Sequence, residues 1–422
     1  MNNALSAYKP TVTTHCHKTP HAVKHPLRLH LRLDCTNLRP HGRRRMVYDT
    51  CLSEGETGDV EMSGDVYIIG AGASAGYGAP TFSDFFDKAE KIMNDESADV
   101  DKERFRSVID VHRKCFPSFN IEQFYSLLEL EEELVGFACE KSASELKKDT
   151  LYLISATIKH SLKNEMSEGA SDFIKKLDED ATSGNSSKIT IINLNWDLLF
   201  DSYFFENCMR INYGHESCDL DGLCDNKYKP KPSALLKILK LHGSLNWLVC
   251  PECIEDDKKI FFVRDYIIGE SYEEDENRCC AHCGCQLERL IVPPVFTKLS
   301  KDPKYEPMKD IWRLAEYSLV EAERIHIMGY SFPVTDTQFE SFFINSLIKN
   351  KSLGEVIIVT YPKYGREKME FEGRYASIFR HTGHYEKISF EHSPFEKYIK
   401  SEDDSGRYLY QPRVPPIKIK SI

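Results

Sequence analysis

Residues Lys237–Cys253 read KILKLHGSLNWLVCPEC, and this stretch decides the fold. Its first part, up to Leu241, is an apolar run of the kind that a buried strand shows. The run ends at His242, which is followed at once by the turn residues Gly243–Ser244. Eight positions after the histidine, the first of two Cys-x-x-Cys pairs begins. The stretch therefore predicts a strand end that presents a histidine and then enters a four-cysteine segment.

The two cysteine pairs, Cys250/Cys253 and Cys280/Cys283, are separated by 26 residues. Paired thiols at this spacing suit a tetrahedral, closed site for structural Zn²⁺. Alternative ligands are the other members of the CCAHCGC run: Cys279, His282 and Cys285. Redox-active thiols are the competing interpretation, which the paired spacing disfavours. The 14 cysteines lie in a long chain without a recognisable secretory signal. They favour metal and free thiols over disulfides, and hence a cytoplasmic protein.

Charge and hydropathy limit the classes of partner. The net charge is −11, although residues 1–45 hold nine Lys/Arg and one acid; these give +8 and leave −19 for the remainder. The strongly negative charge of residues 46–422 argues against nucleic acid as the main ligand, since phosphate contacts need clustered cations. The longest apolar runs fall short of the ~18 residues of a membrane helix, so no membrane partner is expected. An oligomer is compatible with this composition.

The chain divides into a basic extension, a main domain and a tail. Residues 1–62 lack apolar periodicity and are predicted to be disordered. A nucleic-acid arm, a transit peptide and a translation start at Met46 or Met62 are alternative interpretations. The main domain is predicted over residues 63–400, with a helical insertion at about 85–185 and the zinc module at about 248–288. Residues 401–422 are read as an irregular surface tail.

Strands alternate with helices along the main domain. Apolar, β-branched runs predict buried strands at Val66–Ile69, Ile189–Ile192, Ile325–Met328 and Glu355–Val359. This alternation predicts an α/β fold with a Rossmann-like, doubly wound parallel sheet.

Two of these strands end in residues suited to a ligand site. The first runs into a glycine-rich turn that begins at Gly70, where the backbone and the next helix N-terminus can approach a phosphate. The second runs into Asn193-Leu194-Asn195-Trp196-Asp197, and open α/β sheets place their sites at such strand ends. A plain strand–helix turn and simple helix capping are the structural alternatives. For His242, the corresponding alternative is a hydrogen-bonded turn residue.

In chain order, the segments GAGAS…GAPTF, NWD, LHGS, CPEC, CAHC, IVPP and GYSF resemble the sirtuin-like family, in particular its bacterial branch tied to phage defence. The resemblance spans about residues 65–362. It implies NAD⁺ as substrate, cleavage of the nicotinamide–ribose bond and a structural zinc module. Asn195 would position the nicotinamide ribose and a water, and His242 would be the catalytic base. The implied dinucleotide-binding residues are Gly70, Ala71, Gly72, Ser74, Asp197, Gly329 and Ser331.

The sequence also departs from the protein-deacylating members of that family. Their Pro-Asp-Phe-Arg is matched by Pro80–Ser83, which reads PTFS, and their Gln before the Asn is Leu194. Pro293–Pro294 stands where they hold an acyl-lysine peptide as a strand, and proline donates no ladder hydrogen bond. These losses favour an NAD⁺ glycohydrolase, plausibly in anti-phage defence, with an activator encoded by a phage or the same operon. The alternatives are an NAD⁺-dependent protein deacylase and a catalytically silent NAD⁺ or ADP-ribose sensor.

Overall fold

The computed structural model describes residues within one compact unit, residues 61–422. The described residues are 64–134, 141–162, 168–182, 188–207, 211–215, 217–219, 236–253, 260–262, 278–280, 283–292, 305–361, 366–402 and 408–411. The predicted extension 1–62, the Pro293–Pro294 pair, His282 and residues 412–422 lie outside them.

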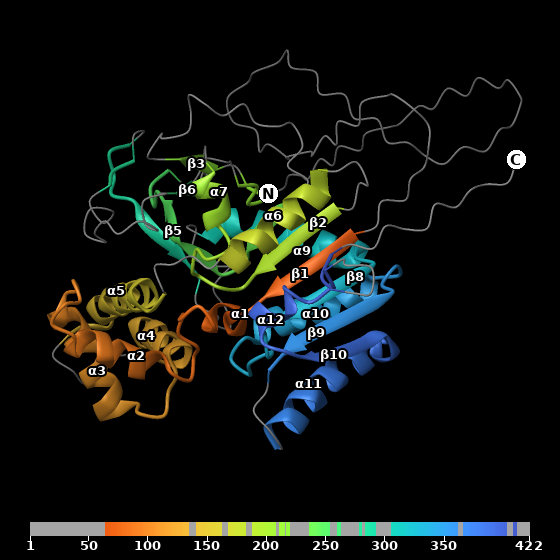
Figure 1. Cartoon of the computed structure of the whole chain (residues 1–422). Coiled ribbons are helices and arrows are strands. Elements are labelled where there is room, and N and C mark those ends of the chain that lie inside the picture. The colour runs from red at the N-terminus through yellow and green to blue at the C-terminus, as the bar shows by residue number, and fades with distance from the viewer. Residues whose placement is uncertain are drawn as a thin grey trace, which may run out of the picture. The chain divides into compact units, whose positions relative to one another are not determined.

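A six-stranded parallel sheet forms the centre of the unit, in the order β10-β9-β8-β1-β2-β4 (Figure 1). Its strands are β1 (Gly64–Ile69), β2 (Lys188–Asn193), β4 (Lys237–Lys240), β8 (Arg324–Met328), β9 (Glu355–Thr360) and β10 (Ile388–His392). The inner strands are rich in Ile and Val and buried on both faces, as parallel sheets between helix layers require. The predicted α/β, doubly wound parallel sheet is confirmed.

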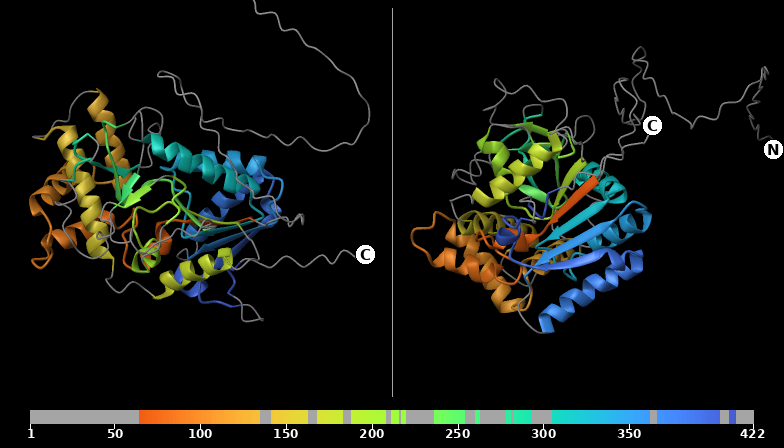
Figure 2. Two further views of the ribbon diagram at one scale, coloured as in Figure 1. Left: turned by 90° about the horizontal axis from the view of Figure 1, so that it is seen from above. Right: turned by 45° about the vertical axis from the view of Figure 1, so that its right-hand side comes forward.

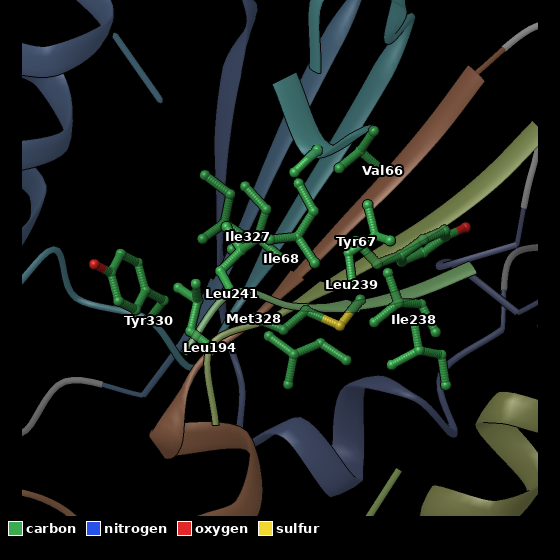
Figure 3. Close-up of a cluster of buried hydrophobic side chains, with 14 of the residues drawn as sticks. Val66, Tyr67, Ile68, Leu194, Ile238, Leu239, Leu241, Ile327, Met328 and Tyr330 are labelled. Atoms are coloured by element: carbon green, nitrogen blue, oxygen red, sulfur yellow. The ribbon is translucent and has the colours of Figure 1, made fainter. Parts of the chain in front are cut away.

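The strand order reverses at β1, which fixes where a ligand site can form. From β1 the chain adds β2 and β4 on one side, then crosses back to add β8, β9 and β10 on the other. The switch point therefore lies between β1 and β8, at their carboxyl ends, where open α/β sheets bind ligands. The side chains beneath it, among them Ile68, Leu239 and Ile327, are fully buried (Figure 3).

Helices cover both faces of this sheet (Figures 1 and 2). The helices on the sheet are α6 (Glu168–Thr182), α12 (Phe395–Tyr398), α9 (Glu306–Glu321), α10 (Thr337–Lys349) and α11 (Arg366–Thr382). On one face, Phe173 of α6 and Phe395 of α12 have ring centroids 5.6 Å apart. On the other, Trp312 of α9 and Phe342 of α10 lie 4.8 Å apart. Such edge-to-face pairs add to the stability of the helix–helix contacts.

Four helices form the predicted insertion and have a core of their own. They are α2 (Phe85–Asn94), α3 (Lys102–Cys115), α4 (Ile121–Leu134) and α5 (Ala143–Ser161). The Asp101 side chain caps α3, and Ser142 with Glu145 forms a capping box at α5. The insertion was expected to reach residue 185, but α6 packs into the core of the main sheet instead. Apolar residues at helical spacing predicted that α6 is a helix, but they do not indicate which hydrophobic core the helix packs into.

A second sheet carries the cysteine segment. It has the order β3-β6-β5-β7, with β3 (Ser217–Asp219), β6 (Ile260–Phe262), β5 (Gly243–Val249) and β7 (Glu288–Ile291). At its start, Gly243 has φ +73°, and a Cβ there would meet the carbonyl oxygen of Leu290 at 2.1 Å. Only glycine combines this φ with so close an approach, and it lets the chain turn from β4 into β5 directly after His242.

The segment after Ser401 was interpreted as an irregular surface tail, and its described part differs from that. Tyr410 is 1 % exposed within the main core, and its carbonyl accepts a hydrogen bond of 2.5 Å from Tyr67 Oη. The carbonyl of Gln411 accepts one of 2.6 Å from Arg324. The prolines and charged residues of this segment suggested an exposed tail, and nothing in the sequence indicated that Tyr410 would be buried in the core.

Candidate active site and metal centre

A cavity lies at the carboxyl ends of β1, β2 and β4 in the main sheet, next to the switch point. The residues that line it come from the turn after β1, from the helical insertion, from the segment after β2 and from the turn after β4. They are Ala71, Ala79, Pro80, Thr81, Phe82, Phe85, Ile121, Glu122, Ile158, Leu194, Asn195, Trp196, Asp197 and His242. Both predicted catalytic residues thus line one cavity, together with two of the predicted dinucleotide-binding residues.

The glycines of the predicted binding turn have a packing role that the sequence did not indicate. A Cβ on Gly70 or Gly72 would approach the carbonyl oxygen of Gly329 to 2.8 Å. Gly329 itself has φ +64°, and a Cβ there would lie 2.1 Å from the Ala73 nitrogen. The turn after β1 and the turn after β8 are therefore in direct backbone contact. The glycines let the two turns pack closely against each other, and a bulky residue at Gly72 would disturb this packing.

Asn195 ties the end of β2 to the glycine turn. Its Nδ2 group donates to the Gly70 carbonyl at 3.1 Å and to Ser74 Oγ at 2.9 Å. Its backbone N–H donates to Asn193 Oδ1 at 2.9 Å. Since both amide hydrogens are engaged, Oδ1 is the atom left to act on a ligand. Asn193 therefore holds the backbone of Asn195 in place.

His242 is held between a backbone carbonyl and a carboxylate. Its Nδ1 lies 3.2 Å from the Leu194 carbonyl, and its Nε2 lies 3.7 Å from Asp336 Oδ2. Because a carbonyl oxygen only accepts, Nδ1 carries the proton, and Nε2 has the free lone pair of the neutral ring. Asp336, the N-cap of α10, in turn accepts a hydrogen bond of 2.7 Å from Tyr330 Oη. This arrangement suits a base whose protonated form is stabilised by a carboxylate.

The helical insertion contributes a buried acid to the cavity, Glu122 in the first turn of α4. Its carboxyl is 2 % exposed and accepts a hydrogen bond of 2.6 Å from Thr335 Oγ1, in the loop after β8. Burial raises the pKa of Glu122 to about 8, and the nearby charge of Asp336 adds to the rise. Glu122 is therefore mostly neutral at pH 7.

We expect this buried acid to make stability depend on pH. The ordinary pKa of 4.5 applies in the unfolded chain, and the value in the folded chain is about 8. Between these values the folded state binds the extra proton, so stability falls as pH rises. Relative to Glu122→Gln, the parent should lose up to about 1.4 kcal/mol of unfolding free energy per pH unit across this window. Urea denaturation at pH 5, 6, 7 and 8 measures this; equal slopes for the two proteins would contradict it.

Asp197 lies next to a buried ion pair between Lys240 and Asp201. Its Oδ1 accepts the Leu199 N–H at 3.0 Å, and burial raises its pKa. Lys240 Nζ donates to the Asp197 carbonyl at 2.5 Å and to Asp201 Oδ2 at 3.1 Å, and both side chains are fully buried. Tyr213 Oη also donates to Asp201, at 2.7 Å. The cluster fixes the backbone of the segment after β2. Asp197 does not cap the next helix, because that helix spans Ser202–Glu206 and its N-cap is Asp201.

The other predicted binding residues lie outside the cavity wall. Ser74 is fully buried behind Asn195, whereas Ser331 is exposed on the loop after β8. This loop is strained at Phe332, whose φ is +48°, and Arg374 Nη1 donates to its backbone carbonyl. Sequence reasoning missed Glu122 and Asp336. Asp336 is the N-cap of α10, and an aspartate directly before a helix is a signal that the sequence does contain. The sequence around Glu122 indicated only an acidic residue on the surface of a helix.

The four predicted cysteines form a metal-binding cluster. The thiols of Cys250, Cys253, Cys280 and Cys283 all lie within 4.8 Å of one another. Two of their Sγ–Sγ distances are 3.4 and 3.7 Å, close to the ~3.8 Å edge of a tetrahedral site with metal–sulfur bonds of ~2.3 Å. Antiparallel pairing of β5 with β7 brings the two knuckles together, because Cys250 directly follows β5. The four thiols are positioned to hold a metal ion.

The two neighbouring cysteines are not members of the four-thiol cluster, although the Cys285 thiol interacts with that of Cys283. Cys279 pairs with Gln286 in an isolated bridge and is exposed. The Cys285 carbonyl accepts the Cys280 N–H at 2.7 Å, and the Cys285 N–H lowers the pKa of Cys283, whereas hydrogen bonding to Cys283 raises the pKa of Cys253.

Comparison with models of protein families and with curated proteins finds no match to this chain. Along the described residues, the helices are too short or too polar to cross a bilayer. The case for function therefore depends on the site itself.

Proposed function

We propose that the protein is an NAD⁺ glycohydrolase of sirtuin-like type, which cleaves NAD⁺ to nicotinamide and ADP-ribose. The observation that carries the proposal is that Asn195 and His242 line one cavity at the carboxyl ends of neighbouring parallel strands in a doubly wound sheet. Three separate segments converge there, and each bears one of the motifs by which the sequence resembles that family. Open α/β sheets bind nucleotides outside the carboxyl ends of their strands.

The residues present suit the chemistry of this bond. Cleavage of an N-glycosidic bond develops positive charge on the ribose, releases nicotinamide and adds water to the ribose carbon, with one proton set free. Nε2 of His242 would take that proton, and Asp336 would stabilise the charged ring at 3.7 Å. Oδ1 of Asn195 would accept a hydrogen bond from the ribose hydroxyl or from the attacking water. The dinucleotide phosphates would lie over the glycine turn, outside the cavity.

The metal proposal is separate from the catalytic one. We infer that the four-cysteine cluster holds Zn²⁺, because four thiolates in a closed tetrahedron are a typical structural zinc site. The zinc would fix β5 against β7, and β5 begins next to His242. Its role would be to support the site, not to take part in the reaction.

An assay of nicotinamide release distinguishes the candidate functions. We expect purified protein to release nicotinamide from NAD⁺ with no peptide present, because the Pro-Asp-Phe-Arg acid and arginine and the glutamine of deacylating relatives are absent. Chromatography of nicotinamide and ADP-ribose, with and without an acetylated lysine peptide, measures this. Release that requires the peptide would point to a deacylase. Tight NAD⁺ binding without release would point to a sensor.

A further inference from the structure

The cavity is unsuited to phosphate and well suited to an apolar ring. Aromatic side chains of Phe82, Phe85 and Trp196 line it, with several aliphatic ones. Its acidic members are Glu122 and Asp197, and among the described lining residues none is lysine or arginine. A phosphate in such a place would face carboxyl groups without a compensating cation. The cavity therefore suits a part of a ligand that is flat, apolar and not negatively charged.

Glu122 is the residue of the cavity lining with which a cationic ligand could form an ion pair. Thr335 donates to its Oε2 at 2.6 Å, and the residue as a whole is 2 % exposed. No lysine or arginine stands among the described lining residues, so a cationic ligand would supply the counter-charge that this buried carboxyl group lacks. The indole of Trp196, 9 % exposed, lines the same cavity and offers the best aromatic face for a cation.

We infer that this cavity takes a flat aromatic cation, with Glu122 as its counter-charge and the aromatic wall as its stacking surface. The inference builds on the proposed function: in NAD⁺ the cation is the oxidised nicotinamide ring, and the reduced ring is neutral. Glu122 would thus select the oxidised cofactor. Since the free acid is mostly neutral at pH 7, binding of the cation ionises it and releases its proton to solvent.

Other ionisable groups also face this wall. Asp336 follows the loop that bonds Glu122, Asp197 comes from the segment after β2, and His242 from the turn after β4. Lys88 contacts the Ala79 carbonyl but pairs with Asp84 outside the cavity, at 3.0 Å. Protonation of His242 would oppose a cation, as protonation of Glu122 does. The variant Glu122→Gln separates the two, because it removes only the contribution of Glu122.

The test uses two small probes of one shape, 1-methylnicotinamide, which is a cation, and nicotinamide, which is neutral. Neither needs to be cleaved, so the result stands apart from the fate of the proposed reaction. Titration calorimetry on the full chain should show preference for the cation, with affinity rising roughly tenfold from pH 7 to pH 9 as Glu122 ionises. Repetition in two buffers of different ionisation enthalpy should show release of close to one proton at pH 7.

Glu122→Gln should lose the preference for the cation and the proton release, whereas Glu103→Gln, an exposed acid on α3, should behave as the parent. Equal affinity of the parent for the two probes, no binding of either at millimolar concentration, or an unchanged preference in Glu122→Gln would overturn the inference. A protein that cleaves NAD⁺ yet shows no preference refutes this inference alone. A protein that prefers the cation yet cleaves nothing refutes the proposed function alone.

Discussion

His242→Ala is expected to lower the rate of NAD⁺ cleavage by ~10²–10⁴, the usual loss for an acid–base group. The histidine acts on a proton in the transition state, so the affinity for NAD⁺ should change little. Asp336→Asn keeps the shape of the carboxylate and removes its charge, and should give an intermediate loss. Single-turnover rates and NAD⁺ binding by calorimetry, on all three proteins, measure this.

A matched control for His242 exists elsewhere in the chain. His384 is also 8 % exposed or less, and its Nε2 bonds a backbone carbonyl, that of Leu347, at 3.0 Å. It does not line the cavity, so His384→Ala should lower the melting temperature without a specific loss of rate. Asn195→Ala combined with His242→Ala should cost little more than either alone, because the two groups serve one step. Full cleavage by His242→Ala, or an equal loss in His384→Ala, would remove the histidine from the mechanism.

Cys250→Ser and Cys283→Ser are expected to release the metal and unfold the small sheet. Structural zinc contributes ~10–16 kcal/mol of apparent binding free energy in zinc-finger peptides at pH 7, and that energy is folding energy. Because β5 begins beside His242, cleavage should fall together with the metal content. Metal analysis by mass spectrometry and thermal melting measure this, and a strong chelator should reproduce the effect in the parent.

Cys279 supplies the control for the metal prediction. It lies in the same run as Cys280 but outside the four-thiol cluster, and it is exposed. Cys279→Ser should therefore keep its zinc and melt as the parent does. Clean protein without zinc would refute the metal assignment, as would Cys250→Ser and Cys283→Ser variants that melt unchanged.

Local patterns were enough to predict the fold and the metal cluster. Runs such as Val66–Ile69 and Ile325–Met328 are both β-branched and continuous, and a strand buried on two faces admits little else. The metal cluster could be predicted because two Cys-x-x-Cys pairs are a typical ligand set for a tetrahedral metal site, whatever the rest of the chain does. In both cases the signal lies within a few residues.

The residues of the site were harder to predict from the sequence, because the site depends on contacts between segments that are distant along the chain. Glu122 meets Thr335 across 213 positions, and neither residue carries a local sign of this. The glycines at 70 and 72 fitted a phosphate-binding turn, but the carbonyl of Gly329 also explains them. Likewise, α6 and Tyr410 join the main core through tertiary packing that no periodicity encodes.

The most direct test of the account is incubation of purified protein with NAD⁺ beside the Asn195→Ala variant. Both proteins should melt cooperatively, although the variant loses the hydrogen bonds to Gly70 and Ser74. The account predicts that the parent forms nicotinamide and ADP-ribose in equal amounts, and that Asn195→Ala forms them at least ~10²-fold more slowly. A parent that releases no nicotinamide, or a variant that releases it as fast as the parent, would contradict the account.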